Sequence, residues 1–360
     1  MTENRLEIAR TNTRARFEQW AKNPECQANT VSAVLNVDVT SVARKLGYEP
    51  KNMKPEFAIQ RGMLFEHTLF RDDAKVLREA LQKKHDLTSD AAGFLDLRMR
   101  SAGGPLRNSI ESIEKSEKFL TELARPAAIE TEQPAIVSGI TLRLPKGVML
   151  PEATLILDVL TITRAADNRF VLKVGEIKIF PDRGGHTEPG HLSAARAQAG
   201  IYKHALEEWV AARAFEQLVV AREGFLVFTW PASNFPVVRV NEDLSEQAER
   251  ARRGFLQLDS VALRVVAPNA ENYDSTQYQD WVAHSETNFR DSCWGFCELA
   301  IRCQDLALSA NRPILLGNET ARALGSLSLN RAVELLDGAT PETEFEHSLA
   351  EQLSIAGWQN

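Results

Sequence analysis

Acidic and basic side chains lie close together on two apolar segments in the middle of the chain. Asp158 occurs in the run LILDVLTIT, and Glu176 and Lys178 occur in RFVLKVGEIKIF, after a polar turn at residues 166–168. Two converging carboxylates can bind Mg²⁺ or Mn²⁺, because these hard cations prefer oxygen ligands. A neighbouring lysine can orient water and offset charge on a phosphodiester under attack, and Gly175 would let a ligand approach the backbone. The set predicts phosphodiester hydrolysis, whereas Glu-x-Lys alone would fit any solvated strand.

A β-hairpin and a helix must position these residues. The two apolar runs are rich in β-branched residues, which predicts paired strands. Side chains alternate along a strand, so Glu176 and Lys178 share one face. A glycine-rich loop follows, which we expect to be mobile, and then the alanine-rich run 189–214 predicts a helix. Gln198 and Tyr202, four residues apart on this helix, share a face from which an amide and a phenol could hold water or phosphate.

The ordered motifs resemble those of the RecB-like nucleases of the PD-(D/E)XK superfamily. The matching residues are Asp158, Glu176-Ile177-Lys178 and Gln198-Ala199-Gly200-Ile201-Tyr202. The resemblance implies an α/β fold: a restriction-endonuclease-like core with a mixed β-sheet flanked by helices, plus helical insertions and a helical C-terminal tail. It also implies Asp158, Glu176 and the backbone carbonyl of Ile177 as metal ligands. Lys178 would activate water, and Gln198 and Tyr202 would order the site.

A further metal ligand is expected on the helix that follows residue 55. The segment Gly62-Met63-Leu64-Phe65-Glu66-His67 resembles the Gly-x-x-x-His or Gly-x-x-x-Glu segment of the same family. Glu66 is the fourth residue after the glycine, and His67 lies about 100° further around the helix. Only one of them can face the metal, and we predict Glu66, with His67 as the alternative. Both could instead be solvent-facing residues of an amphipathic helix.

Four cysteines are candidates for a second metal centre. Cys26 precedes the predicted core, and Cys293, Cys297 and Cys303 follow it within eleven residues. Four thiolates suffice for one [4Fe–4S] cluster or one zinc ion, and disulfides are not expected in a cytoplasmic chain. One iron–sulfur branch of the RecB-like nucleases, with CRISPR-associated exonucleases and the AddB-type nuclease domain, has one cysteine before the core and three after it. This layout implies a structural [4Fe–4S] cluster, although three residues separate Cys293 and Cys297 where the family usually has two. Zinc and unligated thiols are the alternatives.

Composition limits the class of protein. A net charge of −7 and an isoelectric point of about 5.7 exclude a strongly basic coat protein but allow a nuclease whose basic residues line one channel. Two arginine groups could line such a channel or could be solvated helix faces. They are Arg10, Arg14 and Arg16, and Arg250, Arg252 and Arg253. No run approaches the roughly 18 apolar residues of a membrane helix, and no apolar segment follows the charged N-terminus, so we expect a cytoplasmic protein without membrane contact.

These features predict five segments and one activity. The segments are an N-terminal helical segment with the first cysteine (1–55), a helical segment and cap (56–150), the nuclease core (151–265), a cysteine-bearing segment (266–303) and a helical tail (304–360). We expect a metal-dependent deoxyribonuclease, specifically a single-strand exonuclease, with the substrate implied by the resemblance. DNA repair, CRISPR adaptation or phage defence would suit it, and the lack of a Walker A sequence favours a helicase or defence-complex partner in trans. The alternatives are an endonuclease and a non-catalytic DNA-binding or scaffold subunit of such a complex.

Overall fold

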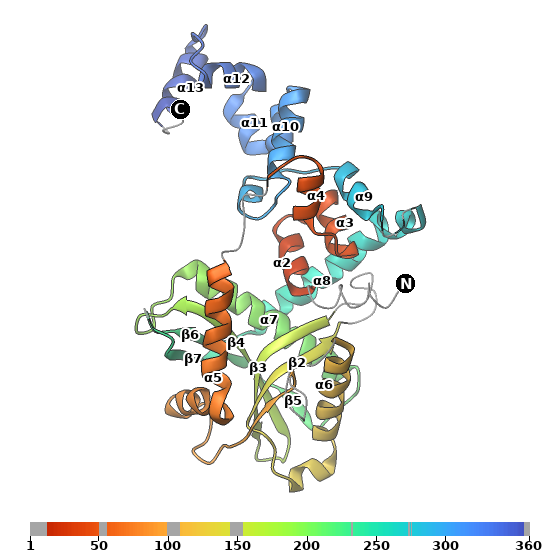
Figure 1. The fold of residues 1–360 in the computed structure, drawn as a ribbon, viewed down its shortest axis with the longest axis vertical. Coiled ribbons are helices and arrows are strands. Elements are labelled where there is room, and N and C mark those ends of the chain that lie inside the picture. Colours follow the sequence, from red (N-terminus) through yellow and green to blue (C-terminus); the bar gives the residue numbers. More distant parts are fainter. Residues whose placement is uncertain are drawn as a thin grey trace. The chain divides into compact units, whose positions relative to one another are not determined.

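The computed structural model describes residues 13–49, 56–98, 109–144, 154–231, 233–272, 274 and 276–355. The chain forms two compact units (Figure 1). The sheet unit comprises residues 1–15 and 54–263, and the helical unit comprises residues 16–53 and 264–360. The carboxylate, lysine, glutamine and tyrosine motifs lie in the sheet unit. All four cysteines lie in the helical unit, so the two ends of the chain fold together.

Within the described residues, seven strands form one mixed, open sheet flanked by helices. They are β1 (Phe94–Asp96), β2 (Ile136–Arg143), β3 (Thr154–Arg164), β4 (Phe170–Pro181), β5 (Leu218–Val220), β6 (Glu223–Thr229) and β7 (Pro236–Asp243). The order is β1-β2-β3-β4-β6-β7, and β5 also pairs with β4. β2, β3 and β4 form an antiparallel meander, whereas β6 is parallel to β4 and antiparallel to β7. Parallel neighbours need a crossover, which α7 (Pro189–Ala211) provides.

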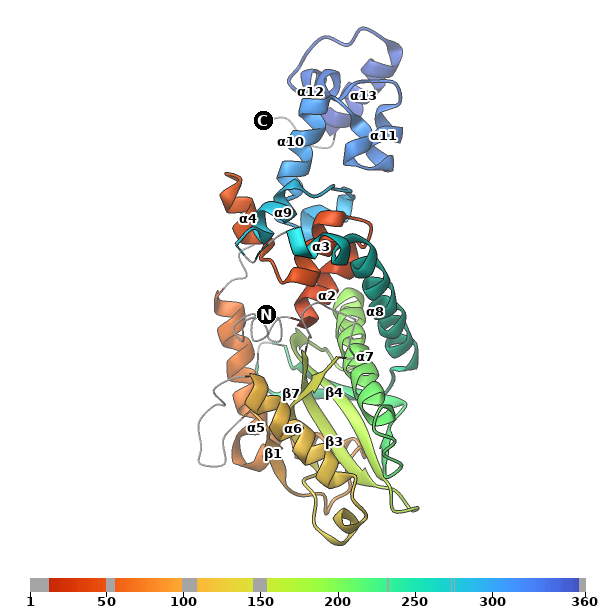
Figure 2. The same ribbon diagram turned by 90° about the vertical axis from the view of Figure 1, so that its right-hand side faces the viewer.

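Helices α5 (Glu56–Lys83) and α7 cover opposite faces of this sheet (Figure 2). Phe65 of α5 packs in one apolar cluster with Val159 of β3 and Ile177 of β4. Side chains alternate along a strand, so the residues next to Val159 and Ile177, which include both predicted carboxylates, point to the α7 face. On that face Ala199 of α7 packs with Leu226 of β6. The α7 face is therefore the one on which the predicted chemistry lies.

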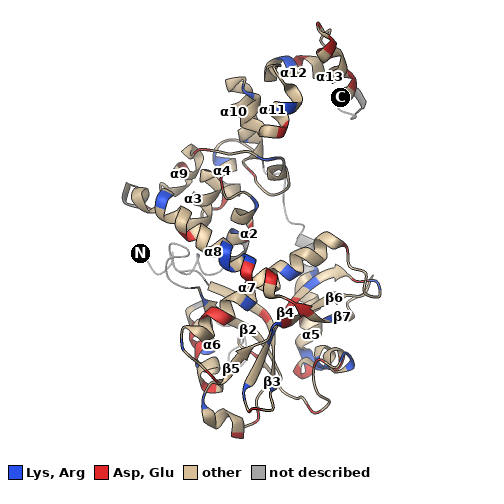
Figure 3. Cartoon of the chain, turned by 180° about the vertical axis from the view of Figure 1, so that it is seen from behind, with Lys and Arg blue, Asp and Glu red and all other residues tan. Residues whose placement is uncertain are grey.

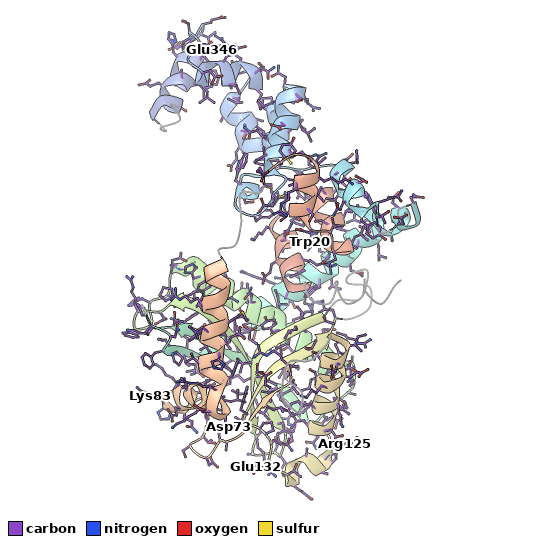
Figure 4. All side chains as sticks on the ribbon, in the orientation of Figure 1. Trp20, Asp73, Lys83, Arg125, Glu132 and Glu346 are labelled. Carbon is purple, nitrogen blue, oxygen red and sulfur yellow. The ribbon has the colours of Figure 1, made fainter. Side chains whose placement is uncertain are left out.

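A break in α5 ties this helix to the edge of the sheet. Residues 71–74 are non-helical, and Asp72, Asp73 and Ala74 have left-handed φ values of 53°, 59° and 52°. The carboxylate of Asp73 (Figure 4) accepts a hydrogen bond of 2.9 Å from the backbone N–H of Phe94, the first residue of β1. Bonds to a charged acceptor of this kind offset part of the cost of left-handed backbone. The sequence does not signal this break, because no Gly or Pro occurs at residues 71–74.

Several other elements differ from the sequence-based expectation. The region 56–150, predicted to be a helical segment and cap, contains β1 and β2 as well as α6 (Ser109–Leu123), so the sheet begins before the predicted core at residue 151. The short β5 was missed. The N-terminal segment that was predicted to be helical contains two short helices after α2, namely α3 (Gln27–Leu35) and α4 (Val39–Lys45). Asn36 ends α3 with a left-handed φ of 53°, and the side chain of Asp38 then caps α4.

The helical unit is built from short helices around buried aromatic and aliphatic residues. Besides α2 from residue 16 onward (α2 is Thr13–Lys22), α3 and α4, it contains α9 (Tyr278–His284), α10 (Ala300–Ala310), α11 (Asn318–Leu324), α12 (Leu329–Leu336) and α13 (Glu344–Ile355). Trp20, labelled in Figure 4, is fully buried and donates its indole N–H to the hydroxyl of Thr30 at 3.1 Å. This bond satisfies the one polar atom of a large apolar side chain. Among the described helices of the whole chain, none is long and apolar enough to cross a membrane.

Candidate active site

Asp158 lies where strands β3 and β4 separate. Their ladder runs from the Arg164–Phe170 pair to the Val159–Gly175 pair, and from Gly175 onward β4 pairs with β6 on its other edge. The backbone N–H of Ile177 points into the opening and donates to Asp158 Oδ2 at 3.1 Å. A side-chain carboxylate thus takes the place of the carbonyl that a continuing ladder would have supplied. The separation of two strands fixes the first predicted carboxylate.

Helix α7 supplies the second hydrogen bond to this carboxylate. The hydroxyl of Tyr202 donates to Asp158 Oδ1 at 3.3 Å, so both oxygens of the half-buried Asp158 accept a bond. Gln198, one turn earlier, is half-buried as well. Its Oε1 atom is buried and has no hydrogen-bond partner within the described part of the chain. The sequence prediction that Gln198 and Tyr202 share a face is consistent with these positions, and Oε1 of Gln198 is an acceptor suited to an ordered water.

A close contact between α7 and α8 (Ser245–Val265) sets the rotation of α7. A Cβ atom on Gly200 would lie 2.4 Å from the Cβ of Gln247 and 2.7 Å from its backbone carbonyl carbon. Only glycine lets the two helix backbones approach so closely. Since Gly200 faces α8, Tyr202, about 200° further around the helix, faces the sheet. The central glycine of the Gln-x-x-x-Tyr segment therefore has a packing role.

Glu176 and Lys178 form a buried ion pair on the α7 face of β4. The Glu176 side chain is fully buried, and the Lys178 ammonium donates to its Oε1 atom. A buried carboxylate needs such a partner, because transfer of an unpaired charge from water is costly. The expectation that Gly175 leaves room for a ligand was wrong. A Cβ there would lie 2.3 Å from the Phe225 ring and 2.6 Å from Cγ1 of Val159, so protein already fills the space.

Glu66, the predicted extra ligand, pairs with an arginine that sequence reasoning missed. Arg98 donates to Glu66 at 2.8 Å and to Asp96 at 3.2 Å. Burial alone would lower the pKa of Arg98, but the bonds to Asp96 and Glu66 outweigh burial and raise it. Of the contacts among described residues, none joins Glu66 to Asp158, and His67 is exposed. The role of Glu66 as a ligand therefore stays a prediction. The alternation Asp-x-Arg after a short strand was the available signal for Arg98.

The glycine-rich loop after β4 is anchored by a buried aspartate. Asp182 accepts bonds from the N–H of Gly185 at 2.6 Å and the hydroxyl of Thr187 at 2.7 Å, and Arg239 of β7 lies 3.5 Å away. Burial alone would raise the pKa of Asp182, but these partners outweigh it and hold the pKa below the ordinary value. The loop that we expected to be mobile is therefore tied down at its base. Its histidine, His186, is exposed.

The first predicted basic group does not line a channel as a whole. Arg16 is buried, and its guanidinium donates to the carbonyls of Ala33 and Val34 at 2.6 and 2.9 Å. Burial lowers the pKa of Arg16 to about 9. Arg16 therefore closes the end of α3, whose last carbonyls have no helical partner. Arg10 and the side chain of Arg14 lie outside the described residues.

The second basic group pairs with acidic residues on its own helix. Arg250 pairs with Glu246 at 2.5 Å, and Arg252 and Arg253 pair with Glu249 at 2.7 and 3.3 Å. Basic and acidic side chains accordingly occur together along α8 (Figure 3). Exposed pairs at this spacing contribute little to stability but offset much of the local positive potential, since two glutamates face the three arginines. Of the two alternatives that the sequence left open, a solvated helix face describes this group of arginines.

The four cysteines line one pocket in the helical unit. Cys26, at the start of α3, meets Cys293, Cys297 and Cys303, although about 270 residues separate the first from the others. The other lining residues are Asn23, Ala28, Asn29, Val39, Thr287, Asn288, Phe289, Phe296, Leu299 and Ala300. The four thiols are free, and Cys293 and Cys303 are buried in an apolar cluster. Four sulfurs around one mostly apolar pocket have the donor chemistry of a [4Fe–4S] or zinc site.

Hydrogen bonds to sulfur support this interpretation of the pocket. The Asn23 amide and the backbone N–H of Arg290 each lie 3.4 Å from Cys293 Sγ. Burial raises the pKa of Cys297 to about 12 and that of Cys303 to about 11, so the bare thiols are protonated at neutral pH. Metal binding would displace those protons, as it does at other thiolate sites. Within the described residues, no three Cys, His, Asp or Glu side chains are already arranged to hold a metal ion, and the four cysteines share a pocket without yet forming a coordination shell.

Comparison with known proteins gives no match: no family model, no curated protein and no solved structure matches the chain. The geometry of the site and the chemistry of its residues therefore carry the functional argument.

Proposed function

We propose that this protein is a metal-dependent nuclease whose active site lies at the separation of β3 and β4. The observation that supports it best is the setting of Asp158. Its two oxygens are oriented by the Ile177 amide and the Tyr202 hydroxyl, on the face where Glu176 pairs with Lys178. Hydrogen bonds of this kind orient the carboxylates that bind metal ions. Two adjacent strands and the crossover helix thus contribute to one polar site.

The order of elements supports a PD-(D/E)XK core for the sheet unit. Helix α5 precedes the antiparallel β2-β3-β4 meander, and α7 leads to β6, which is parallel to β4. The two carboxylates come from the second and third strands of the meander, and the glutamine and tyrosine come from the crossover helix. A mixed sheet flanked by helices is what the family resemblance implied. It supports the resemblance without depending on any one short motif.

The chain's own residues have separable tasks in phosphodiester hydrolysis. Asp158, Glu176 and the carbonyl of Ile177 would hold Mg²⁺ or Mn²⁺, which supplies a Lewis acid and an acidified water. Lys178 would turn its ammonium from Glu176 toward that water and the phosphate, orienting the nucleophile and offsetting negative charge. Water adds to phosphorus as the bond to one ester oxygen breaks. Gln198 Oε1, buried and without a protein donor among the described residues, would accept a hydrogen bond from water in the site.

The cysteine pocket would hold a structural cluster. A [4Fe–4S] cluster bound by Cys26, Cys293, Cys297 and Cys303 would join the two ends of the helical unit across a very long loop, and closing such a loop removes much chain entropy. Zinc is the other candidate. Single-stranded DNA as substrate, action from a strand end and a helicase or defence-complex partner rest on the family resemblance.

Digestion of defined DNA substrates tests the proposal. End-labelled linear single strands and covalently closed single-stranded circles would be incubated with Mg²⁺ or Mn²⁺ and protein purified without oxygen. We expect wild type to degrade linear DNA and spare circles, and we expect Lys178→Ala to lose at least about 100-fold in rate, as for a missing acid–base or electrostatic group. Lys75→Ala is the matched control, because Lys75 is an exposed lysine on α5 whose nearest carboxylate is 3.9 Å away.

Each of the other outcomes would indicate a different function for this protein. Cutting of circles would indicate an endonuclease with the same site. Equal activity of wild type and Lys178→Ala would exclude this site as the source of cleavage. If neither linear nor circular DNA is cut by a preparation that retains its cluster colour, the chain acts as a non-catalytic or partner-dependent subunit.

A further inference from the structure

Two large aromatic side chains stand exposed at the end of the β6–β7 hairpin. Trp230 is 51% exposed and Phe235 is 74% exposed. The backbone N–H of Trp230 donates to the carbonyl of Phe235 at 2.8 Å, so the two residues are direct cross-strand neighbours. Neither ring stacks on another aromatic ring in the described parts of the chain. Exposing two adjacent aromatic rings carries a solvation cost that a binding role would explain.

The hairpin continues the strand layer that carries the proposed active site. Leu226 of β6 is in register with Glu176, and Trp230 lies four residues further on, about 13 Å at ~3.3 Å per residue. Leu226 and Phe228 both pack on the α7 face. The alternation of side chains places Trp230 on that same face, toward which Asp158 also points. A strand of nucleic acid cut at the carboxylates would reach the hairpin within a few nucleotides.

A cationic residue follows a backbone contact to the base of the hairpin. The N–H of Asp182 donates to the carbonyl of Thr229 at 2.9 Å, which places the next residue, Arg183, beside the base of the hairpin. Arg183 is exposed, and its side chain makes none of the ion pairs found between described residues. Arg239 donates to the carbonyl of Gly185 at 2.8 Å and holds this loop in position. Among the described arginines of the sheet unit, most others pair with a carboxylate, whereas Arg183 makes no such ion pair and can contact a phosphate.

We propose that Trp230 and Phe235 bind unpaired bases of the substrate strand by stacking, with Arg183 contacting its backbone. Aromatic faces combined with a cation are the recognition chemistry of single-stranded nucleic acid, because every base has a π-face and every linkage a phosphate. The turn between the rings includes the polar residues Ser233 and Asn234. A protein partner would need a broader apolar patch. The inference rests on the proposed function and names its substrate class.

Oligonucleotide binding without cleavage tests the inference. A labelled single-stranded oligonucleotide would be titrated in chelator, so that no metal-dependent cutting occurs, with wild type, Trp230→Leu, Trp230→Phe and Phe235→Leu. We expect Trp230→Leu and Phe235→Leu each to weaken binding about fivefold or more, and Trp230→Phe to keep most of the affinity. Phe345→Leu, which alters a 46% exposed aromatic residue on α13, is the control and should bind as wild type does. Melting temperatures should be unchanged, because the altered rings are exposed.

Abasic substitutions in the oligonucleotide identify the stacked bases. Removing one base at a time should weaken binding to wild type at particular positions, and at one of these Trp230→Leu should show no further loss. Full-affinity binding by both leucine variants would overturn the inference, as would absence of any oligonucleotide binding by wild type. If the leucine substitutions instead change only the sedimentation of the protein, the hairpin is a self-association surface and the inference fails. If Lys178→Ala cleaves as fast as wild type while Trp230→Leu still loses binding, the proposed catalytic site fails and the stacking surface stands.

Discussion

Removal of the Tyr202 hydroxyl is the most direct test of how the site is held together. Tyr202→Phe keeps a buried ring of nearly the same volume and deletes only the O–H group that donates to Asp158 Oδ1 at 3.3 Å. The Ile177 amide still holds Oδ2 at 3.1 Å, so Asp158 loses one of the two hydrogen bonds that orient it. The change therefore isolates the contribution of α7 to the orientation of the carboxylate.

The geometry sets the size of the expected effect. Hydrogen bonds to charged groups are worth about 1.5–3 kcal/mol, and O–H donors usually approach a carboxylate to about 2.5–2.7 Å. A bond of 3.3 Å belongs at or below the lower end of that range, at about 1–1.5 kcal/mol, which corresponds to roughly a tenfold change. We expect Mn²⁺ affinity and cleavage rate to fall by about tenfold. This is at the low end of the ~10–100-fold loss found when a residue that hydrogen-bonds to a metal ligand is changed. Stability should change by less than about 1 kcal/mol, since water can reach the half-buried Asp158.

Calorimetric titration with Mn²⁺ and cleavage of end-labelled DNA would measure the two quantities. Tyr278→Phe, which deletes a hydroxyl in the helical unit, serves as the control. In an Asp158→Asn background the Tyr202→Phe change should have little further effect, because the shared partner is already lost. Unchanged Mn²⁺ affinity and rate in Tyr202→Phe would refute the view that α7 orients the carboxylate. A fall in rate without a fall in Mn²⁺ affinity would place Tyr202 on the substrate.

Three further changes probe packing, acid stability and the cysteine pocket. Gly175→Ala should destabilise the sheet unit by about 1–3 kcal/mol, because the added Cβ would overlap the Phe225 ring. Urea unfolding would measure this loss. Gly62→Ala is the control and should be neutral or stabilising, because its added Cβ meets no neighbouring element within 4 Å. Asp182 has a lowered pKa in the folded state, so its stabilising effect is present above the ordinary pKa of 3.8 and is lost as the pH falls through the lowered pKa. Asp182→Asn should therefore flatten the dependence of the unfolding free energy on pH in that acidic range. An unchanged slope would contradict this role of Asp182. Cys303→Ser should abolish the brown cluster colour and lower the melting temperature. The iron and zinc contents of the wild type would show which metal the pocket holds. A colourless wild type that contains neither metal would contradict a metal role for the pocket.

Local pattern in the sequence was enough to predict the parts of the site. The β3–β4 hairpin follows from two β-branched runs around a polar turn, and α7 follows from its alanine-rich composition. Alternation along β4 places Glu176 and Lys178 on one face, and helical periodicity places Gln198 and Tyr202 together. These features depend on residues within a few positions of one another, so periods of about 2 and 3.6 residues reveal them.

Contacts between distant segments were decided only by the tertiary structure. The opening that gives the Ile177 amide to Asp158 exists because β3 leaves its edge of β4 after the Val159–Gly175 pair, and the pairing of Glu66 with Arg98 joins a helix to the end of an edge strand. The Phe225 ring, from a strand after the crossover, fills the space beside Gly175. The shared pocket of the four cysteines likewise requires the two ends of the chain to meet. Sequence periodicity reports which face a residue occupies, whereas the partner it meets there is set by chain folding over long separations, which leaves no local pattern.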